Sequence, residues 1–528
     1  MVVKKGAEFM VTVDKVLEAI EYFCNGSRPD IAELDKIFNE YADNSIEYLR
    51  NFSNVLLSRT AGIIDNYDIS EDIYYIKSFL LKVCEDTQIY ISVLKDVLSD
   101  YGLSKEQKYF IYYQMIRYNF LHSGMVNEKI TELMDDLYDQ VYEGFKSEFQ
   151  GEFEYILRED RNKGFVIAFI SQLLEVGHGP TTTLMDRCYI LEKYLGKKVF
   201  IINTAEFGST YKTIDWFRAV EASYNNDFND KELYPYKDCE FNFYQCPNVM
   251  PETSIIREII NVVQSEKPYF IINVGGNSIV SDICSNIVPT LTVSTVFSGR
   301  TQTRGQFQAI ARNITDSDRL WIKKHNLPND HIIQAPFTFA FKEQKHSYTR
   351  TELGFPEDKM VVVLVGGRLD AEIDLECLNM LYRLAEAGLY IVFVGVFERY
   401  YDCIKNNHIF KENSLYMGFQ QDVLAIDELC DIYVNPRRTG GGGAAVEALY
   451  KGVPALSLKF GDAAVSVGKD FQVDSFEQMY NEIINYKEQP EYYKKMKNKA
   501  RSRAEYLMDS KTHFINVIRQ MEKSDAFK

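Results

Sequence analysis

The sequence lacks the features that mark several large classes of protein. Its nine cysteines are scattered and none forms a Cys-x-x-Cys pair, which argues against a structural zinc site and against a disulfide framework. No apolar run approaches the roughly 18 residues that a bilayer-spanning helix needs, and residues 1–30 mix charged with apolar positions, unlike a cleavable signal segment. We therefore predict a soluble, cytoplasmic protein with reduced thiols.

Proline is nearly absent from the first third of the chain. Pro29 is the only proline before Pro180, and apolar residues recur there at steps of three and four, which is typical of long helices. Residues 1–150 contain 15 Lys and Arg and 26 Asp and Glu, so they carry −11 of the chain's net charge of −17. Residues 1–158 are predicted to form an acidic, all-helical domain that binds an acceptor or a partner. Its charge disfavours nucleic acid and stable membrane insertion.

Strands and helices alternate after this region. Apolar runs that are typical of buried strands occur at residues 165–170, 199–202, 269–274 and 289–293, and a second series begins near Val361 and ends near Leu458. Such alternation predicts parallel sheets covered by helices on both faces. We predict an α/β fold with two doubly wound Rossmann-like domains facing a cleft, residues 159–342 on the acceptor side and residues 343–505 on the donor side. Ligands then bind beyond the carboxyl ends of the strands.

The most informative segment runs from Tyr433 to Leu458. A short apolar run breaks at Asn435-Pro436 and passes through four glycines, Gly440, Gly441, Gly442 and Gly443, into a helix-forming run. Glycines let backbone N–H groups approach a ligand, and the orphan N–H groups of a helix N-terminus suit a phosphate. Glu447 lies one turn inside the helix, where a carboxylate can reach ribose hydroxyls. The pattern predicts nucleoside diphosphate binding, and a glycine loop that serves packing alone is the alternative.

This segment resembles the donor site of the two-domain (GT-B) glycosyltransferases, and the resemblance covers about residues 160–528. Further landmarks stand in the family's order: Arg368 after an apolar strand and two glycines, the Gly418 loop, and the Cys430–Pro436 run. The resemblance implies a metal-independent hexosyltransferase that uses a nucleotide sugar, with UDP as the expected nucleotide. The donor-binding residues that it implies are Arg368, Gly418, Phe419, Gln420, Arg438, Thr439, Gly440, Gly441, Gly442, Gly443 and Glu447.

The sequence departs from the family pattern at two positions. Many retaining members carry two glutamates separated by seven residues, but Thr439 stands where the first of them is expected. Many also carry a lysine five residues after the arginine, where this chain has Ile373, so Arg437 and Arg438 become candidates to meet the phosphate charge. The stereochemical outcome stays open. So do two other functions: a non-catalytic GT-B subunit that binds and activates a partner transferase or substrate protein, and a nucleotide-sugar epimerase.

Candidate residues of the first Rossmann-like domain lie in two loops. His178, at the end of the first strand's loop, is suited to act as a general base, and stabilising its own turn is the alternative. Gly179 and Thr181, in the loop before a helix predicted over residues 184–195, and Asn277 and Ser278, after a later strand, are predicted on the acceptor or sugar side. The sequence shows no Asp-x-Asp pair in a convincing context and no metal-ligand spacing, so we expect no metal and no cofactor beyond the nucleotide sugar.

The carboxyl-terminal region is interpreted as helical. The basic run 492–503 reads as a charged helix face, and residues 506–528 are predicted to pack back on the first Rossmann-like domain, as in the resembled family. An all-helical domain before a GT-B body resembles bacterial protein glycosyltransferases, including adhesin and O-GlcNAc-transferase-like enzymes. We therefore expect a protein or glycan acceptor, with a protein preferred, and the oligomeric state stays open.

Overall fold

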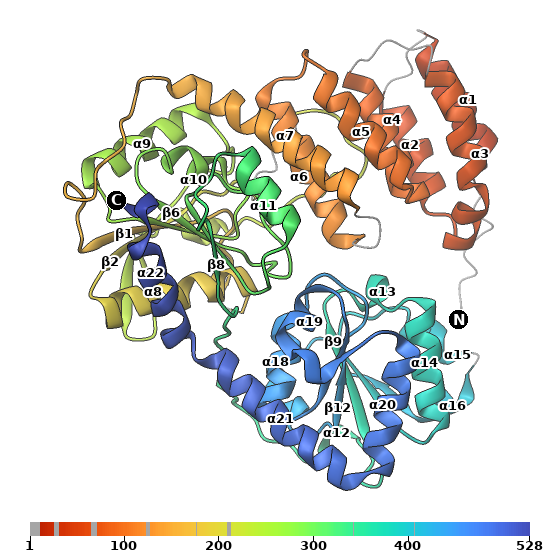
Figure 1. Ribbon diagram of the computed structural model, residues 1–528. Coiled ribbons are helices and arrows are strands. Elements are labelled where there is room, and N and C mark those ends of the chain that lie inside the picture. The colour runs from red at the N-terminus through yellow and green to blue at the C-terminus, as the bar shows by residue number, and fades with distance from the viewer. Residues whose placement is uncertain are drawn as a thin grey trace. The chain divides into compact units, whose positions relative to one another are not determined.

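The chain divides into two compact units (Figure 1). The computed structural model describes residues 11–25, 31–64, 71–122, 127–175, 177–207, 213–341, 343–405 and 407–528. One unit consists of Met1–Glu148 with Thr210–Ala222, and the other of Phe149–Ser209 with Ser223–Lys528. The first contains helices and the second contains two sheets. The boundary predicted at residue 342 falls on a residue outside the described ranges.

The first unit is helical, as predicted. Its helices are α1 (Val13–Cys24), α2 (Ile31–Ala42), α3 (Ile46–Ile64), α4 (Glu71–Cys84), α5 (Thr87–Ser99), α6 (Lys105–Leu121) and α7 (Glu128–Lys146). Polar residues begin several of them, because a side-chain oxygen satisfies orphan N–H groups of the first turn. Ser104 and Gln107 form a reciprocal capping box at α6. Phe38 and Phe79 stack with ring centroids 3.7 Å apart in the apolar core between α2 and α4.

The first sheet of the second unit has eight strands in the order β3-β4-β2-β1-β5-β6-β7-β8. The strands are β1 (Phe165–Ile170), β2 (Lys198–Asn203), β3 (Leu233–Tyr236), β4 (Cys239–Gln245), β5 (Ile271–Val274), β6 (Thr290–Val293), β7 (Phe307–Ile310) and β8 (Ile332–Gln334). All neighbours pair in parallel except β3, which forms an antiparallel hairpin with β4 that the sequence pattern did not predict. The strand order reverses between β1 and β5, which pair directly.

The second sheet has six parallel strands in the order β11-β10-β9-β12-β13-β14. They are β9 (Val361–Gly366), β10 (Tyr390–Gly395), β11 (Ser414–Tyr416), β12 (Ile432–Val434), β13 (Ala455–Leu458) and β14 (Gln472–Val473). Val361, Val362, Val363 and Leu364 are fully buried, as a parallel strand covered on both faces requires. The order reverses between β9 and β12, where Ile432 lies opposite Val362.

Helices connect the strands in both domains. They include α8 (Gly179–Leu195), α10 (Ile279–Cys284), α11 (Asp316–Lys324), α13 (Leu369–Glu372), α14 (Leu375–Glu386), α17 (Val423–Asp427), α18 (Gly442–Tyr450), α19 (Gly461–Val467), α20 (Phe476–Glu488), α21 (Pro490–Met508) and α22 (Ser510–Lys523). The others are α9 (Thr253–Glu266), α12 (Arg350–Leu353), α15 (Tyr400–Lys405) and α16 (His408–Glu412). The helix predicted from residue 184 begins at Gly179 instead, because Pro180 fits a first turn.

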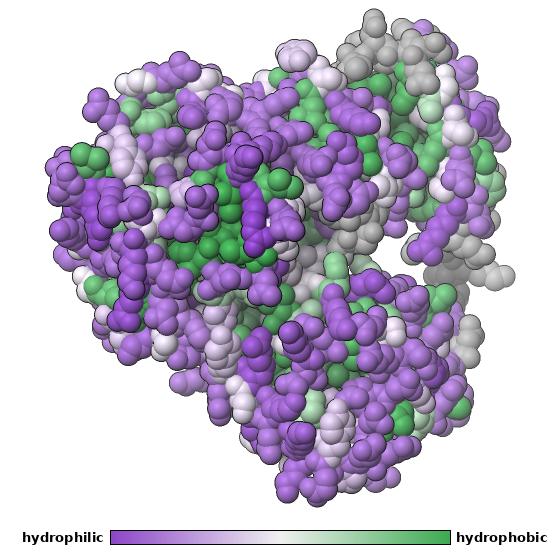
Figure 2. Space-filling view, in the orientation of Figure 1, coloured by the Kyte–Doolittle hydropathy of each residue, from purple (hydrophilic) through white to green (hydrophobic). Residues whose placement is uncertain are grey.

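The last two helices pack on different sheets. α21 buries Met496, Ala500 and Leu507 in the core of the second sheet, whereas Phe514 and Met521 of α22 lie in the core of the first. In the part of the chain that the structure describes, no helix has the length and apolar character needed to cross a bilayer. On the face seen in Figure 2, hydrophilic residues cover most of the surface and apolar residues fill smaller areas. The predicted α/β fold class, with a helical region before two parallel-dominated sheets, is confirmed.

Candidate active site

Most of the predicted site residues follow the strands at which the order of each sheet reverses, and the Gly418 loop instead follows the edge strand β11. In the second sheet, β9 leads into Gly366-Gly367-Arg368 and β12 leads into the segment 435–443. In the first sheet, β1 leads into the loop that ends at His178 and β5 leads into the segment 275–278. A doubly wound sheet opens a crevice beyond the carboxyl ends of its strands at such a reversal. The fold therefore brings residues from distant parts of the sequence to the carboxyl ends of neighbouring strands in each sheet.

The glycine segment ends in an uncapped helix N-terminus. α18 begins at Gly442, no side chain caps it, and Gly441 has a φ of +86° that favours glycine. A Cβ on Gly442 would lie 2.7 Å from Ser466 Oγ and 2.8 Å from Phe297 Cζ, whereas a Cβ on Gly443 would meet no atom within 4 Å. Open space thus lies next to backbone N–H groups that have no partner within the helix, and the helix dipole favours an anion there.

Arg438 lies behind the glycine segment and is 7% exposed. Its Nε donates to Asn435 Oδ1 at 2.8 Å, Nη1 to Glu372 Oε2 at 2.9 Å, and Nη2 to the Tyr433 hydroxyl at 2.7 Å. A Cβ on Gly441 would lie 2.3 Å from Arg438 Nε, so the guanidinium can occupy this position only because residue 441 is a glycine. Arg438 therefore supports the glycine segment through protein contacts, and its direct contact with a phosphate stays a prediction.

Arg368 shares a carboxylate with Arg438. Glu372 Oε1 accepts hydrogen bonds from Arg368 Nε at 3.2 Å and Nη2 at 3.0 Å, while its other oxygen binds Arg438. The Arg368 side chain is 37% exposed, so it keeps access to solvent at the start of α13. Arg437 is more exposed, and its Nε lies 3.7 Å from Asp374 Oδ2. Of these three arginines, Arg368 combines partial exposure with a fixed position beside the crevice.

Glu447 is a half-buried carboxylate on α18 that accepts no hydrogen bond from any described residue. Burial, and secondarily the charge of Asp422, raise its pKa to about 7. A second carboxyl lies nearby: Asp427 of α17 is fully buried, and neither of its oxygens has a hydrogen-bond partner among the described residues. Burial and the charge of Glu447 raise the Asp427 pKa well above its usual range. No sequence pattern marks Asp427, because its position beside Glu447 depends on the packing of α17 against α18.

The loop after β11 carries the residues predicted to contact a base. The Gly418 carbonyl accepts a hydrogen bond from Gly395 N at 2.8 Å, which ties this loop to the end of β10. Phe419 is 77% exposed, an unusual position for a large apolar ring. Gln420 Nε2 donates to the Met417 carbonyl at 2.8 Å. An exposed ring on an anchored loop is suited to stack on a planar base.

His178 is the N-cap residue of α8 in the first Rossmann-like domain. Its Nδ1 lies 3.1 Å from Thr181 Oγ1, and the same hydroxyl oxygen accepts a hydrogen bond from Leu174 N at 3.1 Å. Thr181 is fully buried, so its hydroxyl orients the imidazole. A Cβ on Gly179 would meet no atom within 4 Å. The half-buried histidine thus contacts its own turn through one ring nitrogen, at the crevice of the first sheet.

Asn277 and Ser278 are placed differently from each other. Asn277 is partly exposed with a φ of +52°, and its Nδ2 donates to Thr301 Oγ1 at 2.9 Å. Ser278 is fully buried and caps α10, where its Oγ accepts from Ser281 N at 3.1 Å. The Ser278 hydroxyl also donates to Glu206 Oε2 at 2.5 Å, and burial raises the pKa of that glutamate to about 7. Ser278 is therefore engaged in shaping the loop.

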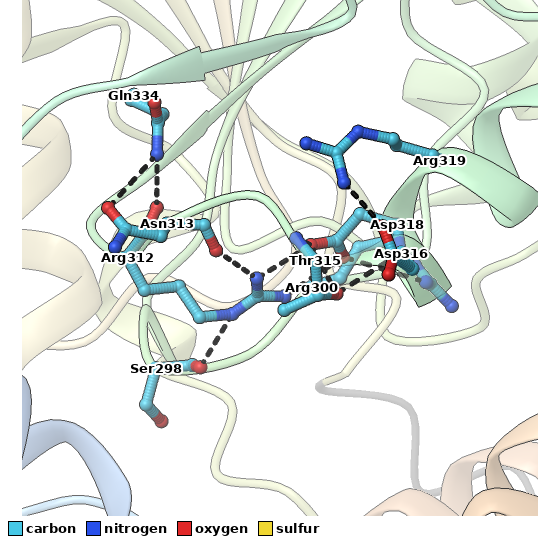
Figure 3. Close-up of polar contacts among 9 residues, drawn as sticks. All are labelled: Ser298, Arg300, Arg312, Asn313, Thr315, Asp316, Asp318, Arg319 and Gln334. Atoms are coloured by element: carbon cyan, nitrogen blue, oxygen red, sulfur yellow. Dashed lines mark hydrogen bonds and ion pairs between the residues drawn. The ribbon is translucent and has the colours of Figure 1, made fainter.

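A polar network connects the loops that follow the strands of the first sheet (Figure 3), and Ser298 links it to the glycine segment through Asp462. Arg312 Nη1 and Nη2 donate to the Asp318 carboxylate at 2.7 and 3.0 Å, and its Nε donates to the Ser298 carbonyl at 2.9 Å. Burial alone would raise the pKa of Asp318, but these bonds and those from Thr315 lower it to about 2. Ser298 N donates to Asp462 Oδ1 at 2.8 Å. Asp462 N in turn donates to the Thr439 carbonyl at 2.7 Å.

Comparison with known proteins agrees with this architecture. No known family model matches the sequence, and no curated protein matches it. A mutant O-GlcNAc transferase from Thermobaculum terrenum is 12% identical, with a TM-score of 0.57 over 100% of this chain and 99% of that chain. A glycosyltransferase from Rickettsia africae is 11% identical, with a TM-score of 0.50 over 69% of this chain and 100% of that chain. The chain has the GT-B fold. Identities this low show the fold alone.

The two positions at which the sequence departs from the GT-B family pattern, 439 and 373, lie in the second Rossmann-like domain. Thr439, which stands in place of a glutamate, has a buried hydroxyl oxygen with no hydrogen-bond partner among the described residues, and its carbonyl accepts from Asp462 N. Ile373, which stands in place of a lysine, is 2% exposed in the core of the second domain. Among the described residues, no group of three or more His, Cys, Asp or Glu side chains is arranged to hold a metal ion.

Proposed function

We propose that the protein is a glycosyltransferase that moves a sugar from a nucleoside diphosphate, UDP by preference, to a protein or glycan acceptor. The observation that carries the proposal is the combination of an uncapped, glycine-lined helix N-terminus with a half-buried carboxylate one turn further along the same helix. Glu447 accepts no hydrogen bond from the described residues, so its oxygens are available to two ribose hydroxyls. The GT-B fold supports this assignment, because such folds bind ligands at the strand reversal.

The proposed donor orientation follows from the charges and shapes of the second domain. The diphosphate oxygens bind the N–H groups at Gly442 and Gly443. A Cβ on Gly442 would clash with Ser466 and Phe297, whereas the space beside Gly443 is open. Arg368 adds positive charge from β9's side of the crevice, and Phe419 covers the base. Leaving-group stabilisation by fixed amides and a cation lowers the barrier for departure of the nucleotide without reorganisation during the reaction.

In the proposed transfer step, an acceptor oxygen or nitrogen forms a bond to the anomeric carbon of the sugar while the bond from that carbon to the phosphate oxygen breaks. The bonding electrons leave with the nucleoside diphosphate, and the acceptor's proton moves to His178. The hydrogen bond between His178 and Thr181 keeps the imidazole oriented, as a general base requires. We propose that this step uses no metal ion. We also propose a cytoplasmic location, because nine scattered free thiols are typical of a reducing compartment.

Transfer and binding can be tested separately. The purified chain is incubated with radiolabelled UDP-sugars and a cell lysate, and incorporation into protein and release of UDP are measured. We expect transfer from one donor and slow hydrolysis of that donor without acceptor. The absence of both activities with every nucleotide sugar, together with no calorimetric signal for UDP, GDP or ADP, would contradict the proposal.

A non-catalytic GT-B subunit is the second candidate, and the residues at positions 373 and 439 favour it. Ile373 stands where many family members carry a lysine, and it supplies no charge. Thr439 stands where many carry a glutamate, and it supplies no carboxylate. This candidate predicts that the chain stimulates a separate transferase while its own UDP site is dispensable. If Glu447→Ala left that stimulation unchanged and the chain alone transferred no sugar, the subunit role would replace the enzymatic one.

A further inference from the structure

One segment of the helical unit comes from a distant part of the sequence. Residues 210–222 follow β2 of the first Rossmann-like domain, yet they form a compact unit with helices α1–α7. The structure describes residues 213–222, which form neither helix nor strand, and we name them the internal peptide. Ile214, Trp216 and Phe217 of this peptide are 4%, 7% and 2% exposed. A segment without regular structure is thus buried through its apolar side chains.

The internal peptide inserts an aromatic anchor between α2 and α4. The Phe217 ring lies edge-on to Phe79 at 5.2 Å and 88°, to Phe38 at 6.0 Å and 82°, and to Tyr75 at 6.2 Å and 78°. Its backbone N–H donates to Ser78 Oγ at 2.8 Å. Edge-to-face packing of several rings around one ring is a favourable arrangement. The helices therefore form a shaped pocket for one phenyl side chain.

The backbone of the internal peptide is held by side chains of α6. The Gln114 amide makes two hydrogen bonds with one residue: Nε2 donates to the Val220 carbonyl at 3.0 Å and Oε1 accepts from Val220 N at 2.8 Å. Gln107 Nε2 donates to the Thr213 carbonyl at 3.5 Å. An amide that pairs with a backbone N–H and C=O holds a peptide whatever side chain that residue carries. Gln114 is only 3% exposed, so its polar groups would otherwise be buried without a partner.

A basic residue follows the aromatic anchor. Arg218 has a φ of +44°, and its guanidinium donates from Nε to Asn39 Oδ1 at 2.8 Å and from Nη2 to Asp43 Oδ1 at 2.6 Å. These contacts lie at the end of α2, in a region of the sequence that carries excess negative charge. An anchored ring, a charge pair and backbone recognition are the three elements by which domains bind short peptides.

We infer that α2, α4 and α6 form a peptide-binding groove, and that the internal peptide is its resident occupant. The groove selects an aromatic residue followed by a basic one and holds the flanking backbone without regard to its side chains. The partner that fits is an irregular polypeptide segment of another protein with the same aromatic-basic pair. Because the resident peptide is tethered, it competes at an effective concentration on the order of millimolar, and the groove is closed to weak partners.

The test uses the full-length chain and a fluorescent synthetic peptide with the sequence of residues 213–222. In one variant the internal peptide is replaced by a Gly/Ser linker of equal length, which empties the groove and leaves every helix unchanged. Fluorescence anisotropy should show binding at least about tenfold tighter to this variant than to the unchanged chain. A peptide with Phe217→Ala should bind about tenfold more weakly or worse, and a peptide altered only at Ala219 and Glu221 should bind within about threefold.

A second variant guards against loss of folding in the first. Arg218→Ala with Val220→Pro removes one charge pair and the N–H that Gln114 accepts, while Phe217 stays in its pocket. The synthetic peptide should bind this variant more tightly than the unchanged chain, and should raise the Tm of both variants. The inference is overturned if neither variant binds the peptide while keeping its helical circular dichroism, or if the linker variant unfolds and the peptide fails to restore it. Segment 213–222 would then be an integral part of the helical core.

Discussion

Replacing Glu447 by alanine is expected to weaken UDP binding by about 1–3 kcal/mol, which raises Kd by about 5- to 150-fold. A carboxylate can accept hydrogen bonds from both ribose hydroxyls, and a bond to a charged group contributes about 1.5–3 kcal/mol. Burial raises the pKa of Glu447 to about 7. The cost of keeping the carboxylate ionised therefore offsets part of the free energy gained from its bonds to the ribose. Isothermal titration calorimetry with UDP measures the difference.

Two controls separate a ribose contact from general damage. Glu477→Ala removes an exposed carboxylate of α20 that pairs with Arg383, and should leave the Kd for UDP unchanged. With 2′-deoxy-UDP the unchanged chain should lose affinity, whereas Glu447→Ala should lose nothing further, because the hydroxyl then has no carboxylate to meet. An unchanged Kd in Glu447→Ala, or an equal loss from the missing hydroxyl in both proteins, would refute the assigned contact.

The pH dependence of binding provides an independent check on the same residue. Glu447 has its pKa raised to about 7, so its carboxylate becomes fully ionised only above that pH. UDP affinity should therefore rise with pH through about 7 in the unchanged chain. The Glu447→Gln side chain does not titrate but keeps a hydrogen-bonding oxygen. Any pH dependence that remains in this variant therefore comes from ionisation of the nucleotide's own phosphate. Identical pH profiles for the two proteins would contradict the argument.

Four further predictions concern the rest of the site. His178→Asn should slow sugar transfer by about 10²- to 10⁴-fold with an unchanged Kd for UDP, and a normal rate would remove it from catalysis. Arg438→Lys should weaken UDP binding about tenfold and leave uridine binding unchanged, because it disturbs the glycine segment; equal losses for both ligands would contradict that. The pKa of Glu206 is raised from 4.5 to about 7 by burial, so its contribution to folding is present below about pH 4.5 and is lost, by about 3 kcal/mol, as pH rises through 7. Urea denaturation should show this loss in the unchanged chain and a flatter profile in Glu206→Gln. Removal of divalent cations with EDTA should leave the transfer rate unchanged, and restoration of a lost rate by Mg²⁺ would contradict a metal-independent reaction.

The parts of the fold that follow local patterns were predictable from the sequence. Strands such as β1 are continuous apolar runs, and the helices before residue 150 show apolar residues at regular steps with few prolines. The antiparallel β3–β4 hairpin was missed, because β3 is only four residues long and contains Pro235, and β4 alternates apolar with polar residues instead of forming a continuous apolar run. The start of α8 was placed too late, since Thr181, Thr182 and Thr183 disfavour a helix interior but fit its first turn behind Pro180.

The candidate site was predictable where chemistry lies in one short segment and unpredictable where it depends on packing. The four glycines and Glu447 lie within eight positions of one another, so their relation to a helix N-terminus can be read directly. The inward orientation of Arg438 depends on Glu372, which is far away in sequence. The same is true of the internal peptide, whose Phe217 packs among helices that precede it by more than a hundred residues. Contacts of this kind leave no periodic or compositional signal.

The proposed function depends on a nucleoside diphosphate that binds with its phosphates against the N-terminus of α18. A crystal structure of the chain with UDP tests it most directly. We expect β-phosphate oxygens within hydrogen-bond distance of the N–H groups of Gly442 and Gly443, and ribose hydroxyls on the Glu447 carboxylate. Uridine diphosphate bound elsewhere, or a glycine segment that neighbouring side chains fill when the nucleotide is saturating, would contradict the account.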